Sequence, residues 1–242
     1  MLTTLIAIAC LFPAANDDWK PPKAPDPTEI LQSAKRDVAN GDYETALAKH
    51  VWYHENALRI DPAQYGVRLS FALSYWNDLA EKYEAAELKL IEIRDSALTD
   101  VMASGPDADA KFHDYASING VLGQENMTVK TFKKLHKDKP ELAKKAFGIA
   151  KEYLVKANEY ELAKEYFDGK KEAAQLAAAI GASSDLGPSV ANHYQKQAVE
   201  LIELLIKLDQ KEIAKAVSGD LSKAIKKKSF DRRVKKLLAD DD

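Results

Sequence analysis

The amino-acid sequence predicts an all-α protein, and three observations support this prediction. From about Thr28 onward, apolar residues recur three and four positions apart, the spacing that places them on one face of an α-helix. Runs with the strict alternation of a half-buried strand are lacking. The 242 residues include only 10 Gly and 9 Pro, and 46% of them are hydrophobic and 30% charged. This composition is typical of a helix-rich globular protein rather than of a disordered chain.

The first 27 residues differ from the rest of the chain. The apolar run 'LIAIACLF' is too short to span a bilayer, and it precedes 'PAANDD' and the Pro-rich 'WKPPKAPDPT'. This order predicts a signal peptide over residues 1–15, a linker over 16–27 and a periplasmic or secreted protein. Two alternatives stay open: a lipid anchor on Cys10, and a cytoplasmic protein, since no Lys or Arg precedes the apolar run. Cys10 is the only cysteine, so the body of the chain has no disulfide and no thiol nucleophile.

Short segments that carry Gly, Pro, Asn or Asp interrupt the helical pattern and predict turns. They divide the chain into roughly ten helices, the first of which Asp26 or Thr28 is expected to cap. Gly181 is expected to end a later helix. In chain order, the predicted breaks are 'ANGDY', 'IDPAQYG', 'ASGPDAD', 'LGQENM', 'KDKPE', 'KANEY', 'AIGASSDLGPS' and 'VSGD'.

Four of the helical segments repeat one another imperfectly. They align on an anchor position, which is Tyr43, Tyr83, Glu125 and Tyr160 in successive units. A small residue follows each anchor by three positions, and a larger side chain follows it by seven. These are Ala46, Ala86, Thr128 and Ala163 in the small slot, and His50, Leu90, Phe132 and Phe167 in the large slot. Small residues at fixed offsets let two helices approach, and a large residue fills the hole between them.

The segments 'GDYETAL' and 'ALRIDP' resemble the tetratricopeptide repeat, whose second helix begins after Gly-Asp-Tyr and whose unit closes on Asp-Pro. The resemblance covers residues 28–169, although the first anchors are farther apart than the family's repeat of about 34 residues. It implies a right-handed α-solenoid of antiparallel helix pairs. Residues 170–242 are then C-terminal helices that complete and cap the same array.

The resemblance also implies a function. In this family the first helices line a concave groove that holds a protein or peptide, which predicts a non-catalytic adaptor without a cofactor. The groove positions carried over to this chain are Arg68, Phe71, Tyr75, Asp78, His113, Lys145, Gly148 and Glu152. The Lys and Asn clamp of chaperone-binding members is absent. Ordinary packing or solvent exposure remains the alternative for each residue, and a structural subunit of an envelope assembly remains the alternative for the protein.

The stretch 'HVWYHE' offers a different chemistry. His50 and His54 are four residues apart, so a helix places both on one face, and Glu55 could add a carboxylate to a metal site. However, Val51 stands where the metalloprotease pattern has its glutamate. His50 also occupies the large slot of the repeat, which favours packing over a metal-binding protein or metal-dependent enzyme. Gly-rich phosphate loops, nucleophile elbows and cysteine dyads are missing, so no enzyme is predicted.

The C-terminal segment is strongly basic, with eight Lys or Arg residues between Lys223 and Lys236. These charges could contact an anionic membrane surface or phosphates. The favoured interpretation is an amphipathic helical segment whose apolar residues pack inward while its cations face water. The inward residues are expected to be Leu221, Ile225, Val234 and Leu238. The net charge of −3 argues against nucleic-acid binding by bulk charge.

Overall fold

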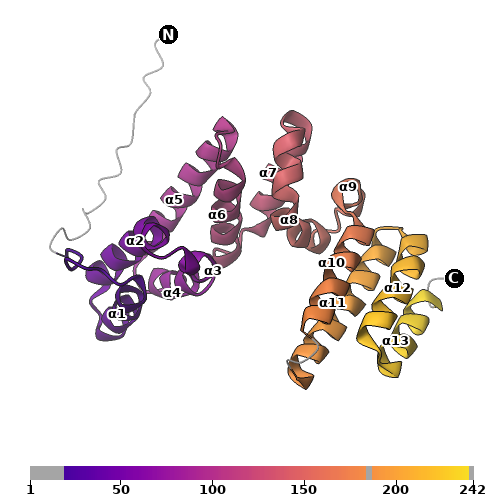
Figure 1. The fold of residues 1–242 in the computed structure, drawn as a ribbon. Helices are drawn as coiled ribbons and strands as arrows, with labels where there is room; N and C mark the ends of the chain where they lie inside the picture. The colour runs from indigo at the N-terminus through magenta and orange to yellow at the C-terminus, as the bar shows by residue number, and fades with distance from the viewer. Residues whose placement is uncertain (1–18, 184–186, 240–242) are drawn as a thin grey trace, which may run out of the picture. The chain divides into compact units, whose positions relative to one another are not determined.

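The structure is a computed structural model that describes residues 19–183 and 187–239. These residues form thirteen α-helices and one 3-10 helix without any strand (Figure 1), which confirms the all-α prediction. The predicted signal peptide over 1–15 and Cys10 lie outside the described residues. None of the described helices combines the length and the apolar character needed to cross a bilayer.

The chain divides into two compact units, Met1–Tyr153 and Leu154–Asp242, and the division falls within helix α8. The first unit holds α1 (Pro27–Asn40), α2 (Tyr43–Ile60), η1 (Pro62–Gln64), α3 (Tyr65–Arg68), α4 (Phe71–Ala80), α5 (Glu84–Ala103), α6 (Ala108–Val121), α7 (Glu125–Asp138) and most of α8 (Pro140–Lys156). The second holds the end of α8, then α9 (Tyr160–Tyr166), α10 (Gly169–Ala182), α11 (Pro188–Lys207), α12 (Lys211–Ile225) and α13 (Lys228–Ala239).

Helix α1 begins and ends on specific local chemistry. The Asp26 carboxylate accepts the backbone N–H groups of Thr28 at 2.8 Å and Glu29 at 3.3 Å, so Asp26 is the cap. Pro27 follows at the first helical position, where the N–H that proline lacks would have no partner within the helix. Gly41 ends the helix with φ +80°, a left-handed conformation that glycine adopts without strain.

One break predicted from glycine, that at Gly219, is wrong, whereas the break predicted around Gly181 is present, since α10 ends at Ala182 and α11 begins at Pro188. Gly181 lies inside α10 and Gly219 inside α12, and an added Cβ at either position would have open space around it. A single glycine costs a helix only about 1 kcal/mol relative to alanine. In α12 the buried residues Ala214, Val217 and Leu221 hold the helix against its neighbours, so this cost is offset by packing.

In the first unit, each helix packs on the next along the chain: α1 on α2, α2 on α4, α4 on α5, α5 on α6 and α6 on α7. Helix α4 also contacts α1 and α6. The small and large positions that follow each repeat anchor lie in these interfaces and, for the fourth repeat, at α9 of the second unit. All eight are buried: Ala46, His50, Ala86, Leu90, Thr128, Phe132, Ala163 and Phe167.

The second unit is a smaller bundle. Helices α10, α11 and α12 contact one another, and α13 packs on both α11 and α12. Gly169 lies so close to α11 that an added Cβ would stand 2.4 Å from Leu205 Cδ2. Close approach at this glycine therefore lets α10 pack against Leu205 without a gap. The buried side chains include Ile202, Leu205, Leu221, Phe230 and Val234.

Candidate functional site

The 'HVWYHE' stretch lies on α2, and both of its imidazoles contact Trp76 of α4. His50 is only 1% exposed, and its ring stacks on the indole with the centroids 5.6 Å apart. Neither ring nitrogen of His50 has a hydrogen-bond partner among the described residues. Burial lowers the pKa of His50 to about 4, so the ring is neutral at pH 7. In this position His50 acts as a packing group.

His54 lies edge-on to the same indole, with the ring centroids 6.1 Å apart. Its Nε2 stands 2.9 Å from Arg68 Nη2, and Arg68 Nε donates to the His54 carbonyl oxygen at 2.7 Å. Because a guanidinium only donates hydrogen bonds, Nε2 is the acceptor and is not free for a metal. Burial and then the Arg68 charge lower the pKa of His54 to about 4.

The geometry gives no support to the metal alternative for His50, His54 and Glu55. Glu55 is exposed, whereas both imidazoles are buried against Trp76. Within residues 19–183 and 187–239, no group of three His, Cys, Asp or Glu side chains is arranged to hold a metal ion. The arrangement instead uses the imidazoles and Trp76 to fill the space between α2 and α4.

Arg68 and Asp114 form a buried ion pair. Arg68 Nη1 donates to Asp114 Oδ1 at 2.6 Å, and Nη2 donates to Oδ2 at 3.0 Å. Together with the two contacts to His54, this pair joins α2, α3 and α6. Both residues are only 8% exposed. Arg68 was expected to line an open groove, but its guanidinium is fully engaged inside the unit and is not available to a partner.

Tyr65 and His113 join α3 and α6 nearer the surface. The Tyr65 hydroxyl and His113 Nδ1 are 2.9 Å apart, and the two rings meet edge-to-face with their centroids 5.7 Å apart. Tyr65 is exposed and His113 is half-buried, which lowers the pKa of His113 by desolvation. His113, an expected groove residue, is therefore partly accessible and already paired with Tyr65.

The most exposed aromatic side chain of the described residues is Phe71, at 61%. It stacks on Tyr75 with the ring centroids 6.5 Å apart, and Lys35 Nζ of α1 lies 3.8 Å from the centroid of the Tyr75 ring. A cation this close to an aromatic face is attracted by the ring quadrupole. We call Lys35, Phe71 and Tyr75 the aromatic surface; it spans α1 and α4.

The other expected groove residues are exposed, one on α4 itself and three on α8. Asp78 is exposed on α4. Gly148 and Glu152 are exposed on α8, as is Lys145, which borders a depression of about 380 Å³. The depression is lined by residues at the α5–α6 and α7–α8 turns, including Ser104, Gly105, Lys139 and Pro140. The structure thus brings Phe71 and Tyr75 into contact, and it places Lys145 at a separate depression.

Three residues of this region were not predicted from the sequence: Lys35, Tyr65 and Asp114. The alignment contained a signal for Lys35, because Lys35 and Tyr75 stand the same number of positions before their anchors, Tyr43 and Tyr83. The other two had no such signal. Asp114 is 46 residues from its partner Arg68, and only the folded chain brings them together.

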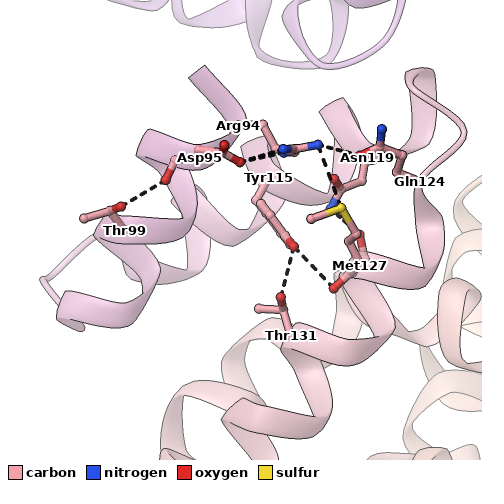
Figure 2. Close-up of polar contacts among 9 residues, drawn as sticks. Arg94, Asp95, Thr99, Tyr115, Asn119, Gln124, Met127 and Thr131 are labelled. Carbon is pink, nitrogen blue, oxygen red and sulfur yellow. Dashed lines mark hydrogen bonds and ion pairs between the residues drawn. The ribbon is translucent and has the colours of Figure 1, made fainter. Parts of the chain in front are cut away.

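A second polar network holds α5, α6 and α7 together (Figure 2). Arg94 of α5 donates to Asp95 and to Gln124, the residue that precedes α7, and also contacts the Met127 sulfur at 3.8 Å. The Tyr115 hydroxyl donates to the Met127 carbonyl oxygen at 3.3 Å and accepts from Thr131 at 3.0 Å. None of these side chains was expected to bind a partner, and the network positions α6 and α7 against α5.

Comparison with known proteins adds no relative: no family model, no curated protein and no solved structure matches this chain.

Proposed function

We propose that the chain is a non-catalytic adaptor that binds a protein or peptide through the aromatic surface. The observation that carries this proposal is the exposure of Phe71, stacked on Tyr75 beside the Lys35 cation. Aromatic side chains are enriched at protein interfaces, and Tyr is among the residues that most often anchor a partner there. No cofactor is needed for this activity.

The aromatic surface has the position expected in a tetratricopeptide-like solenoid. Lys35 and Tyr75 occupy equivalent slots of two successive units, and the Lys35 ammonium lies over the Tyr75 ring. Their helices, α1 and α4, are in contact, and α4 in turn contacts α6. Contacts between the first helices of successive pairs are what stacking of repeats produces. This agreement supports the proposed solenoid and its inner surface of first helices.

The buried ion pair makes the surface a preformed one. Arg68 lies three residues before Phe71, and its contacts to His54 and Asp114 hold the start of α4 against α2 and α6. Phe71 and Tyr75 each have few rotatable bonds, so ordering them against a partner costs little conformational entropy. A rigid receptor of this kind spends little of its binding free energy on its own rearrangement.

We propose, on the expectation of a signal peptide over residues 1–15, that the partner of this adaptor is a protein of the periplasm or cell envelope. We therefore expect that immobilised protein captures a defined partner from envelope extracts, and that Phe71→Ala with Tyr75→Ala reduces this capture about tenfold or more. Leu88→Ala is the matched control, since Leu88 is an exposed apolar residue on α5, outside the aromatic surface. Equal capture by the double variant and the wild type would remove the assignment.

A further inference from the structure

The second unit contains a groove between α12 and α13 that the proposed function does not use. Its volume is about 510 Å³. Phe230, Val234, Leu238 and Ala239 of α13 supply its apolar lining, and Gly219 of α12 stands in its opposite wall. We call this feature the α12–α13 groove.

Gly219 makes the backbone of α12 accessible from the groove. It lies inside a helix without a positive φ, so alanine would be the better helix former at this position. An added Cβ would contact nothing within 4 Å, and therefore no neighbour in the described chain requires the glycine. A helix without a side chain at one position lets a second helix approach closely there.

One face of α13 carries four cations beside the groove. Lys228, Arg232, Lys235 and Lys236 are spaced four, three and one residues apart on α13, which places them on one face of the helix, and all four are exposed. Lys235 also lines the groove itself. Phe230 and Val234 are buried at the floor of the groove, where α13 packs on its neighbours α11 and α12. The cationic face is thus not used to hold α13 in place.

These four cations differ from the other basic residues of the second unit. Lys215, Lys223 and Arg233 each pair with a carboxylate, those of Glu212, Asp220 and Glu203. By contrast, no described carboxylate pairs with Lys228, Arg232, Lys235 or Lys236. Asp231 is the one carboxylate in the described lining of the groove, and it accepts a hydrogen bond from the Ser222 hydroxyl. Lys235 and Asp231 are the two charged residues of the described lining, and the excess positive charge lies on the exposed face of α13 beside the groove.

From the groove, the bare backbone at Gly219 and the four cations of α13 that pair with no described carboxylate, we infer that the α12–α13 groove binds an acidic amphipathic helix of another protein. The apolar face of that helix would enter the groove, and its carboxylates would face Lys235 and Arg232. A membrane surface is flat and does not reach the floor of a concave groove. A single nucleic-acid strand needs exposed aromatic rings for its bases, and Phe230 is fully buried. The inference does not rest on the proposed function, which concerns the first unit.

The test uses the full chain and a fluorescent synthetic peptide as the probe. The peptide is an amphipathic helix with leucines three and four residues apart on one face and glutamates beside them; a scrambled peptide of equal composition is the reference. We expect the amphipathic peptide to bind about tenfold or more tightly than the scrambled one, with an affinity that falls as salt is raised. Gly219→Leu fills the groove and should reduce binding at least as much.

Gly181→Leu is the matched control, because Gly181 is also an exposed glycine inside a helix with open space around it. It should leave binding unchanged, and circular dichroism of both variants should match the wild type. Equal binding of the scrambled peptide would overturn the inference, as would unchanged binding by Gly219→Leu. Binding to anionic phospholipid vesicles without binding to the peptide would also overturn it, in favour of a lipid surface.

Discussion

The two units differ in the side chains that they bury. The first unit buries charged and polar residues among its helices, namely Lys49, His50, His54, Arg68, Arg94, Asp114, Asn119, Thr128 and Thr131. In the second unit, by contrast, every buried residue from 154 to 183 and from 187 to 239 is apolar or glycine. Its charges lie on the surface, where many form local ion pairs between residues three or four apart.

The two units therefore fix the positions of their helices in different ways, the second by apolar packing and the first also by buried polar contacts. Apolar contacts in the second unit are non-directional, so shape alone, such as Gly169 against Leu205, sets the packing. The buried charged groups of the first unit, such as Arg68 and Asp114, need particular partners, because leaving one of them unpaired costs much more than the pair contributes. We therefore interpret the Arg68–Asp114 pair as the contact that sets the geometry beneath the aromatic surface.

The largest expected effect is on the buried ion pair. Asp114→Ala leaves the Arg68 charge buried without its partner and should lower the free energy of unfolding by about 3–5 kcal/mol. The double variant Arg68→Met with Asp114→Leu replaces both charges by apolar groups and should recover most of this loss. Urea denaturation of the three proteins measures both effects. A single and a double variant of equal stability would show that the pair is not coupled.

The next effect concerns His50 and depends on pH. Its pKa is about 4 in the folded protein and near 6.5 in the unfolded chain, so the unfolded chain takes up the proton first as the pH falls. The contribution of the neutral His50 ring to the free energy of unfolding is therefore fully present above pH 6.5, and it is lost as the pH falls toward 4. At pH 5 this loss amounts to about 2 kcal/mol.

His50→Leu removes that loss and also removes two buried ring nitrogens that have no hydrogen-bond partner. At pH 7 we expect the variant to be at least as stable as the wild type. Between pH 7 and pH 5 its advantage in the free energy of unfolding should grow by about 2 kcal/mol. Urea denaturation at both pH values tests this. A variant that is destabilised at pH 7 would show that the imidazole has a partner or ligand in solution.

A smaller effect is expected in the second unit at Gly169. An added methyl group would meet Leu205 Cδ2 at 2.4 Å, so Gly169→Ala should destabilise the unit by about 1–3 kcal/mol through overpacking. Gly181→Ala in the same helix meets no neighbour and should instead stabilise it by up to about 1 kcal/mol. Thermal unfolding of both variants gives the comparison, and shifts of the same sign would contradict it.

The smallest effect is at the N-terminal edge of the first unit. Trp19 packs edge-on against Trp52 of α2 with the ring centroids 6.3 Å apart, and Lys49 Nζ lies 5.8 Å from its ring. Trp19→Ala should lower stability by about 1 kcal/mol. Equal melting temperatures of variant and wild type would show that the segment does not contribute to the unit.

The sequence predicted those features that depend on local chemistry or on the repeat. The eight aligned slots are buried, Asp26 caps α1, and His50 packs in a slot for a large side chain. Arg68 was expected in the groove because its partner, Asp114, is 46 residues away in the chain. From the sequence alone, an arginine whose buried partner is unknown resembles a residue that binds a partner protein. A break was wrongly predicted at Gly219 because composition does not show the packing that holds α12 through a glycine.

The central claim is that a partner binds on the aromatic surface, and crosslinking from that surface tests it most directly. Ser74 is exposed on α4 between Phe71 and Tyr75, so a photoreactive amino acid at this position would lie within reach of a bound partner. In intact cells we expect one defined protein adduct from position 74, lost when Phe71 and Tyr75 are changed to alanine. No adduct at position 74, or the same adduct from position 88 on α5, would contradict the account.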